Sequence, residues 1–231
     1  MRLLSTVSGL TAMAVLLTGC GATGNSAAAP GAPAAKAPAA ESPESVRQPA
    51  ALVPAAAKAA AAKPKYVFPV RAKNVSFHKT HSGYAATDIF AACGKPVVAT
   101  TGGVVLEVSR VDKYKKSKKD GPYNGGKFVS IKGDDGVRYY GSHLSKVQAG
   151  INKGVRVKAG QVLGKVGKTG NSSGVCHLHY GISPPCKKTG DWKVRRGVVW
   201  PAKYLTSWRK GGQKSPAAAV RTWNKKHNCK A

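Results

Sequence analysis

The chain has 231 residues, enough for one domain of ordinary size with a tail or for two very small domains. Its 38 Lys and Arg residues stand against 9 Asp and Glu residues, which gives a formal net charge of +29. A merely solvated basic surface does not account for so large an imbalance. It predicts a polyanionic partner, such as nucleic acid, an anionic cell-wall polymer or anionic lipid headgroups.

Residues 1–20 read MRLLSTVSGLTAMAVLLTGC, with one Arg followed by an uncharged apolar stretch. The stretch is shorter than the roughly 20 residues that span a bilayer and ends in small residues, which is typical of an export signal. The ending LTGC resembles the lipobox of bacterial lipoproteins. That resemblance implies that Cys20 carries a diacylglycerol anchor, whose two chains hold a protein stably on a membrane. The alternative is an ordinary cleaved signal that happens to contain a Cys.

Residues 21–65 consist mainly of Ala, Pro, Lys, Gly and Ser, with almost no large apolar side chain. Such a segment cannot bury enough apolar surface to offset the entropy lost on ordering. We interpret it as a disordered tether between the anchor and the rest of the chain. Together with the signal, it predicts a lipoprotein on the extracytoplasmic face of the cell membrane, reaching into the cell wall.

Residues 66–231 are expected to form the folded domain. Short β-branched runs alternate apolar and polar residues and are separated by Gly, which indicates an all-β domain of antiparallel strands in a sheet or sandwich. Helical periodicity is weak. Short helices are expected only near the C-terminus, at residues 201–208 and 215–224, with Pro216 in the first turn of the second. The runs that predict strands are residues 96–99, 103–108, 127–131, 137–140 and 161–166.

The basic segment KYKKSKK, residues 113–119, continues into a polar, Gly-rich stretch. We interpret it as an exposed loop between two strands that touches anionic polymer. A nucleic-acid-binding patch is the alternative, and it is less compatible with an exported protein.

Four cysteines remain after Cys20, namely Cys93, Cys176, Cys186 and Cys229. In an exported protein an even number predicts disulfides, here two. Three pairings are open. Since Cys176 and Cys186 flank one short segment, we expect Cys176–Cys186 and Cys93–Cys229. Four free thiols or a metal site are alternatives, although no CxxC spacing supports the latter.

Two of the six histidines form the tripeptide His177-Leu178-His179. In a strand, residues i and i+2 point to the same face, so both imidazoles would project into one space with Leu178 on the opposite, core side. Paired histidines on a strand fit a metal site. By itself the HxH pattern is weak, because surface strands carry such pairs by chance.

The surrounding motifs make the pattern more specific. In chain order they are HSGYAATDIFA (81–91), GKPVVA (94–99), YGSHL (140–144), GKTGNSSG (167–174) and HLHYGIS (177–183). This arrangement resembles the lysostaphin-like zinc metallopeptidases over roughly residues 66–205. The resemblance implies the duplicated hybrid motif, a β-sheet fold, and a peptidase that hydrolyses bacterial peptidoglycan.

The resemblance also assigns roles. His81, Asp88 and His179 correspond to the protein ligands of Zn²⁺, which leaves a fourth position open for water, as a catalytic zinc requires. His143 and His177 correspond to the catalytic pair that handles the proton and the transition state.

The first motif departs from the family pattern H-x-x-x-D. Tyr84 stands four residues before Asp88, and the nearest histidine, His81, stands seven before it. A loop absorbs a three-residue insertion at little cost, so we expect His81 to reach the metal. His78 is the fallback ligand. A site that lacks one ligand, and is therefore inactive, is the third reading.

The sequence thus predicts a zinc-dependent endopeptidase that acts on peptidoglycan peptides, is held by anionic cell-wall polymers, and is monomeric. The alternative is a catalytically inactive wall-binding or hydrolase-activating module of the same fold. The export signal and the cysteines argue against nucleic acid as the partner, and a purely structural anchor leaves the histidines unexplained. The aromatic and arginine residues of the stretch 191–201 could line a substrate groove or pack a C-terminal helix on the sheet. The packing role is expected for Trp200 and Tyr204, and His227 is expected to be solvated.

Overall fold

A computed structural model describes residues 65–118, 120–188 and 190–231. The predicted export signal, Cys20 and all but the last residue of the predicted tether lie outside these residues. Within them, no helix combines the length and the apolar character needed to cross a membrane.

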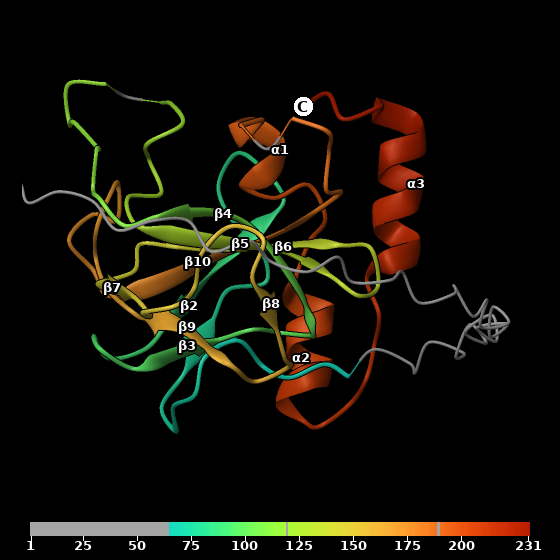
Figure 1. The fold of residues 1–231 in the computed structure, drawn as a ribbon, viewed down its shortest axis with the longest axis horizontal. Coiled ribbons are helices and arrows are strands. Elements are labelled where there is room, and N and C mark those ends of the chain that lie inside the picture. The colour runs from blue at the N-terminus through green and yellow to red at the C-terminus, as the bar shows by residue number, and fades with distance from the viewer. Residues whose placement is uncertain (1–64, 119, 189) are drawn as a thin grey trace, which may run out of the picture. The chain divides into compact units, whose positions relative to one another are not determined.

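Ten strands form two antiparallel sheets (Figure 1). The larger sheet has the order β1-β2-β10-β6-β5-β4-β8 and the smaller has the order β3-β9-β7. The all-β prediction is therefore confirmed, and a strand lies in each of the five predicted runs. The strands are β1 (Ser76–Phe77), β2 (Ala86–Phe90), β3 (Pro96–Val98), β4 (Gly103–Ser109), β5 (Phe128–Gly133), β6 (Arg138–Ser142), β7 (Lys146–Val147), β8 (Arg156–Val157), β9 (Val162–Lys165) and β10 (His177–Ser183).

One hydrophobic core joins the two sheets. Val97 of β3 and Leu163 of β9 belong to the same buried cluster as Ile131 of β5 and Leu178 of β10. The core side of each strand follows from alternation, because successive side chains of a strand point to opposite faces. The opposite face of the larger sheet is therefore free to carry polar side chains.

Three helices follow the last strand: α1 (Trp192–Arg195), α2 (Ala202–Arg209) and α3 (Ala217–His227). Helices α2 and α3 confirm the two predicted ones, each with a proline at its N-cap position. Tyr204 is buried against Trp208, as expected. Trp200 is 44% exposed, so the prediction that it packs on the sheet is wrong. It lies in the connection between α1 and α2.

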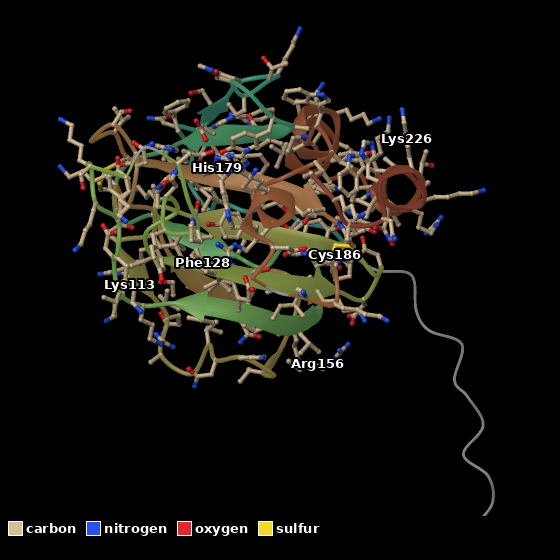
Figure 2. All side chains as sticks on the ribbon, turned by 90° about the horizontal axis from the view of Figure 1, so that it is seen from above. Lys113, Phe128, Arg156, His179, Cys186 and Lys226 are labelled. Carbon is tan, nitrogen blue, oxygen red and sulfur yellow. A yellow bond between two sulfur atoms is a disulfide. The ribbon has the colours of Figure 1, made fainter. Side chains whose placement is uncertain are left out.

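All four cysteines form disulfides, but the expected pairing is wrong: the bonds are Cys93–Cys176 and Cys186–Cys229. Strands β2 and β10 are antiparallel, with His177 opposite Phe90, so Cys93 after β2 and Cys176 before β10 emerge at the same end. Their Cα atoms are 5.3 Å apart. The second bond ties the end of α3 to the turn after β10, and Figure 2 shows it beside that helix.

The basic segment lies between β4 and β5, as predicted, and Lys113, Lys115 and Lys116 are exposed. In Figure 2 the side chain of Lys113 points outward, away from the sheets. Later residues of the same connection, Asp120 and Asn124 among them, turn back toward the outer face of the larger sheet. One loop therefore carries both surface charge and part of a pocket wall.

A fully buried arginine on β6 connects that strand to the segment before α1. Arg138 donates to both carboxylate oxygens of Asp191, at 2.7 and 3.0 Å, and to the carbonyl of Pro184. Substitution of Asp191 by alanine would leave a buried charge without its counter-ion. We expect the free energy of unfolding to fall by about 3–5 kcal/mol, measured by denaturant titration.

The matched control is Asp134→Ala, which removes the partner of Arg156, a guanidinium that is 66% exposed. Exposed pairs contribute only about 0–1 kcal/mol, so this variant should unfold near the wild-type midpoint. Equal destabilisation by the two substitutions would contradict the role given to the buried pair.

Candidate metal centre

Strand β10 presents its two histidines on the outer face of the larger sheet. His177 and His179 share that face, while Leu178 is fully buried in the core on the other side. Both imidazoles are themselves more than nine-tenths buried. The alternation expected from the HLH tripeptide is confirmed.

Asp88 comes to the same face from the neighbouring strand. In the antiparallel β2–β10 pair its Cα lies directly opposite that of His179. Opposite residues of such a pair project side by side, which places Asp88 Oδ1 3.0 Å from His179 Nδ1. Ile89, the next residue, points into the core, so alternation fixes the direction of Asp88.

His81 reaches the site through the turn that precedes β2. Gly83 in this turn has φ of +84°, a conformation that favours glycine. The turn absorbs the three additional residues and brings His81 Nε2 to 3.8 Å from Asp88 Oδ2. Tyr84, which stands where the family pattern has histidine, lies beside it with the ring centroids 4.4 Å apart. His78 instead packs against Phe90.

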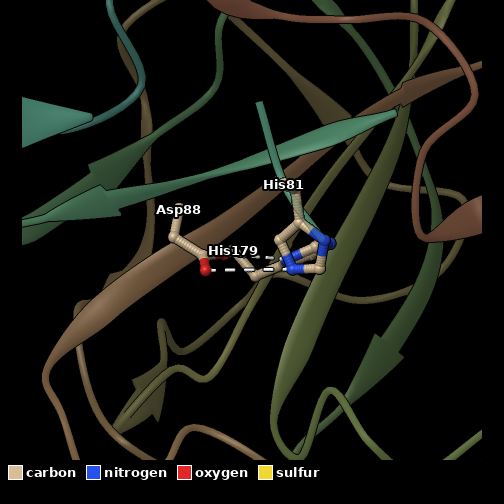
Figure 3. Close-up of side chains that lie close together, drawn as sticks. All are labelled: His81, Asp88 and His179. Atoms are coloured by element: carbon tan, nitrogen blue, oxygen red, sulfur yellow. Dashed lines mark hydrogen bonds and ion pairs between the residues drawn. The ribbon is translucent and has the colours of Figure 1, made fainter. Parts of the chain in front are cut away.

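Figure 3 shows His81, Asp88 and His179 pointing toward one another. One donor atom from each residue can be chosen so that all three lie within 4.8 Å of one another. Among the described residues this is the one cluster of at least three His, Cys, Asp or Glu side chains with such spacing. Two imidazoles and a carboxylate are a donor set that suits Zn²⁺.

Backbone carbonyls fix the tautomers of three site histidines. The Nδ1 atoms of His81, His143 and His177 lie 2.7, 2.7 and 2.9 Å from the carbonyl oxygens of Ser82, Thr169 and Val175. A carbonyl only accepts, so each Nδ1 must carry the hydrogen. In the neutral imidazoles each Nε2 therefore keeps its lone pair for a metal or a proton.

His179 has the opposite tautomer. Its Nε2 donates to the carbonyl oxygen of Arg196 at 2.9 Å, which leaves the lone pair of the neutral ring on Nδ1, the atom that faces Asp88. A lone pair and a carboxylate oxygen 3.0 Å apart repel unless a cation or a second proton lies between them. This contact, together with the free Nε2 of His81, fits a metal ion held by these three residues.

The electrostatics of the site keep its groups ready to bind a cation. Burial alone would raise the pKa of Asp88. When Nδ1 of His179 carries a second proton, it donates to the carboxylate, and this hydrogen bond, the charge of His179 and the charges of His177 and His81 lower the pKa of Asp88 to about 2. Burial, followed by the charges of His179 and His177, lowers the pKa of His143 to about 3. Burial and His179 also lower the pKa of His81. At neutral pH the carboxylate is thus ionised, while His81 and His143 are neutral.

His143 and His177 form a second pair beside the metal-ligand candidates. Their ring centroids are 4.7 Å apart, and neither belongs to the three-residue cluster. His143 directly follows β6 and has φ of +64°, an unusual conformation for a residue with a side chain. Strand β6 pairs with β10, so the residue that follows β6 comes close to the histidines of β10. The ring centroids of His143 and His179 are 6.0 Å apart.

These side chains line a pocket of about 570 Å³ whose wall includes residues of the stretch 191–201, for which the sequence offered a substrate groove as one interpretation. Trp192, Arg195 and Arg196 enter it from α1 and the residue that follows. Helix α1 has only four residues and shows no periodic signal, so nothing in the sequence predicted it. Its contact with β10 places these side chains over the site.

The Arg196 carbonyl that holds His179 requires a small residue on β10. A Cβ atom at Gly181 would collide with this carbonyl oxygen and with that of Arg195. Substitution of Gly181 by alanine should displace the carbonyl and free the His179 ring. Loss of such a supporting contact typically weakens metal binding about 10- to 100-fold, and we expect that change in a zinc titration.

Gly190→Ala provides the control, because a Cβ there meets open space. Its zinc affinity should equal that of the wild type. An unchanged affinity in the Gly181 variant would show that the Arg196 carbonyl does not position His179.

The chain is similar in sequence to several known peptidases. Residues 80–190 match the model of peptidase family M23. The chain is 30% identical over 145 residues to the L-Ala–D-Glu endopeptidase of Bacillus subtilis strain 168, covering 60% of this chain and 38% of that protein. It is 36% identical over 94 residues to the glycyl-glycine endopeptidase ALE-1 of Staphylococcus capitis, covering 40% and 22%. The matched segments thus span well under half of either relative.

Solved structures of similar proteins include the catalytic domain of the antimicrobial peptidase lysostaphin from Staphylococcus simulans. It is 25% identical to this chain, with a TM-score of 0.45, and the match covers 58% of this chain and 93% of that one. The full-length antimicrobial peptidase lysostaphin from the same species gives 24% identity and a TM-score of 0.47, covering 68% and 59%.

Proposed function

Since residues 80–190 are a peptidase family M23 domain, we propose that this chain is a zinc-dependent endopeptidase that hydrolyses peptide bonds in bacterial peptidoglycan. The observation that carries the proposal is the convergence of His81, Asp88 and His179, with backbone contacts that leave one nitrogen lone pair on each neutral imidazole. The substrate class follows from the two curated relatives, whose names describe endopeptidases of L-Ala–D-Glu and glycyl-glycine bonds.

His81, Asp88 and His179 would hold the metal through Nε2, a carboxylate oxygen and Nδ1. Bound there, Zn²⁺ supplies Lewis-acid polarisation of the scissile carbonyl and lowers the pKa of water to about 7. The Arg196 carbonyl keeps the His179 ring in the orientation that presents Nδ1.

His143 and His177 supply the proton chemistry. Each is anchored through Nδ1–H to a carbonyl, so each is free to accept a proton at Nε2. The low pKa keeps His143 neutral in the free site, so its ring would hold a proton only while negative charge develops on the nearby carbonyl oxygen, and the resulting cation would stabilise that charge. Their burial excludes bulk water from this position and strengthens the effect.

The second candidate function is an inactive wall-binding or hydrolase-activating module. The departure from the family spacing at Tyr84 motivates it. The position of His81 favours the active enzyme. His81 stands three residues further from Asp88 than the histidine of the family pattern, but the turn before β2 brings its imidazole to the site.

The test is digestion of purified cell-wall sacculi by the purified chain, with and without zinc. We expect soluble peptides and new amino termini to appear with zinc and to disappear with a chelator. A chain that binds zinc and releases no peptides would support the inactive module instead.

The basic surface is proposed to hold the enzyme on anionic wall polymers. Among the described residues, none of the ion pairs uses a lysine, so the lysine charge is not neutralised locally. In Figure 2 Lys113 and Lys226 lie on the outside of the molecule with their side chains directed outward. Binding of this kind weakens as salt screens the charges.

The membrane anchor at Cys20 and the tether of residues 21–65 are proposed from the sequence alone. Substitution of Cys20 by serine removes the thiol that would carry the lipid. We expect the protein to move from the membrane fraction to the soluble extracytoplasmic fraction, followed by immunoblotting of fractionated bacteria. A variant that stays with the membrane would contradict the anchor.

A further inference from the structure

Two consecutive arginines, Arg195 and Arg196, line the pocket, and their surroundings differ. Both side chains come from the segment after the residues that match the family model. In Figure 1 this segment, at and just after α1, lies against the larger sheet.

Arg195 is buried, and both of its terminal nitrogens have acceptors. Its side chain is 7% exposed and donates to Glu107 Oε2 at 2.8 Å and to the carbonyl of Pro122 at 3.1 Å. Its guanidinium also packs over the rings of Phe128 and Tyr140. Because these contacts engage both terminal nitrogens, Arg195 has a structural role in the pocket wall.

Arg196 is oriented but weakly bonded. Its guanidinium carbon lies 3.9 Å from the ring centroid of Tyr84 and 4.9 Å from that of Trp192, so two aromatic rings fix its position. Among the described residues, its side chain makes one hydrogen bond, a long contact of 3.4 Å to Asp120 Oδ1. Asp120 is 57% exposed on the loop between β4 and β5. Most of the five guanidinium N–H groups therefore have no protein acceptor.

The position of this guanidinium places it beside the candidate metal centre. Tyr84, on which it stacks, lies 4.4 Å from His81, and the backbone carbonyl of Arg196 holds His179. A peptide bound across the site would pass Arg196 within one or two residues of the bond that is cut, since an extended chain advances about 3.3 Å per residue.

We propose that the Arg196 guanidinium is a carboxylate-binding subsite that recognises an acidic group of the substrate next to the scissile bond. A planar guanidinium held between aromatic rings matches a carboxylate, which it binds through two parallel hydrogen bonds. Asp120 occupies this position weakly and gives way to the substrate. The inference rests on the proposed endopeptidase function.

The test compares two blocked pentapeptides that differ only in a central Glu or Gln. Their binding is measured by calorimetry on the chelator-treated chain, which separates this test from any failure of catalysis. We expect the wild type to bind the Glu peptide about fivefold more tightly than the Gln peptide. The Arg196→Met variant should bind both peptides equally. Equal binding by the wild type would overturn the subsite.

Two further variants sharpen the result. Asp120→Asn removes the competing carboxylate, so the preference for Glu should grow; a smaller preference would show that Asp120 itself contacts the substrate and would overturn the proposal. Arg156→Met removes the same charge from a pair on β8, outside the pocket, and should keep the wild-type preference. A loss of preference in this control would show that overall charge, and not Arg196, recognises the peptide.

Discussion

The alanine variant of His179 is expected to lose both zinc and activity. His179 supplies the donor that faces Asp88 directly, and without it two donors from the turn and β2 remain. Two ligands hold Zn²⁺ poorly, and the metal supplies several kcal/mol of transition-state stabilisation. We expect peptidoglycan hydrolysis to fall on the order of 10³-fold or more, measured as release of peptides from sacculi at saturating enzyme.

His227→Ala is the control for this variant. His227 stacks on Trp223 near the end of α3, outside the pocket lining. Removing it should change neither zinc content nor rate. If the His179 variant retains zinc at the wild-type affinity, the proposed ligand set is wrong even if activity is lost.

The alanine variant of His143 is expected to keep the metal and lose the reaction. His143 lies outside the three-residue donor cluster, so zinc content should stay at the wild-type level. Loss of a general acid or base typically lowers the rate by about 10²- to 10⁴-fold, and we expect a fall of kcat in that range with little change in KM.

The matched control for this variant is His78→Ala, a histidine whose ring packs on Phe90. It should retain most of the activity. A His143 variant with wild-type kcat would assign the proton transfer to His177 alone, and loss of zinc from the variant would contradict the division between binding and catalytic histidines.

The sequence predicted the β architecture and the side chains that share one face of β10, because both follow from the local alternation of residues. In HLHYGIS, period-two geometry alone places His177 and His179 together and Leu178 in the core. Local signals also predicted α2 and α3, since each has a proline at its N-cap position and a run without glycine.

The spacing of the sequence limited the first metal ligand to two histidines but did not decide between them. His78 and His81 both precede Asp88 in one loop, and loop length does not determine which side chain turns inward. In the structure, the conformation at Gly83 and the contact between the rings of His81 and Tyr84 turn His81 inward. The ligand roles of His81, Asp88 and His179 stay predictions until metal is observed.

The expected pairing of Cys176 with Cys186 is wrong, and the sequence already contained the reason to exclude it, although two other pairings would have remained open. Once residues 177–183 are read as an extended strand, Cys176 and Cys186 stand at its two ends. Seven residues at about 3.4 Å each hold them more than about 20 Å apart, whereas a disulfide requires Cα atoms within about 7 Å. Proximity in sequence was a poor guide because the intervening chain is straight.

The sequence offered a substrate groove as one interpretation of the aromatic and arginine residues of 191–201, but helix α1 and its position over β10 could not be predicted. A four-residue helix has too few turns for a periodic pattern, and its place over β10 depends on the buried pair between Arg138 and Asp191. The tautomer of His179 depends on a carbonyl from this segment, so part of the site's chemistry lies in tertiary structure alone.

The three-residue metal site is tested most directly by anomalous X-ray scattering at the zinc edge from crystals of the zinc-loaded protein. We expect one strong peak between His81 Nε2, the Asp88 carboxylate and His179 Nδ1. A folded protein with no peak at that position, or with its peak at His78 or His227, would contradict this ligand set.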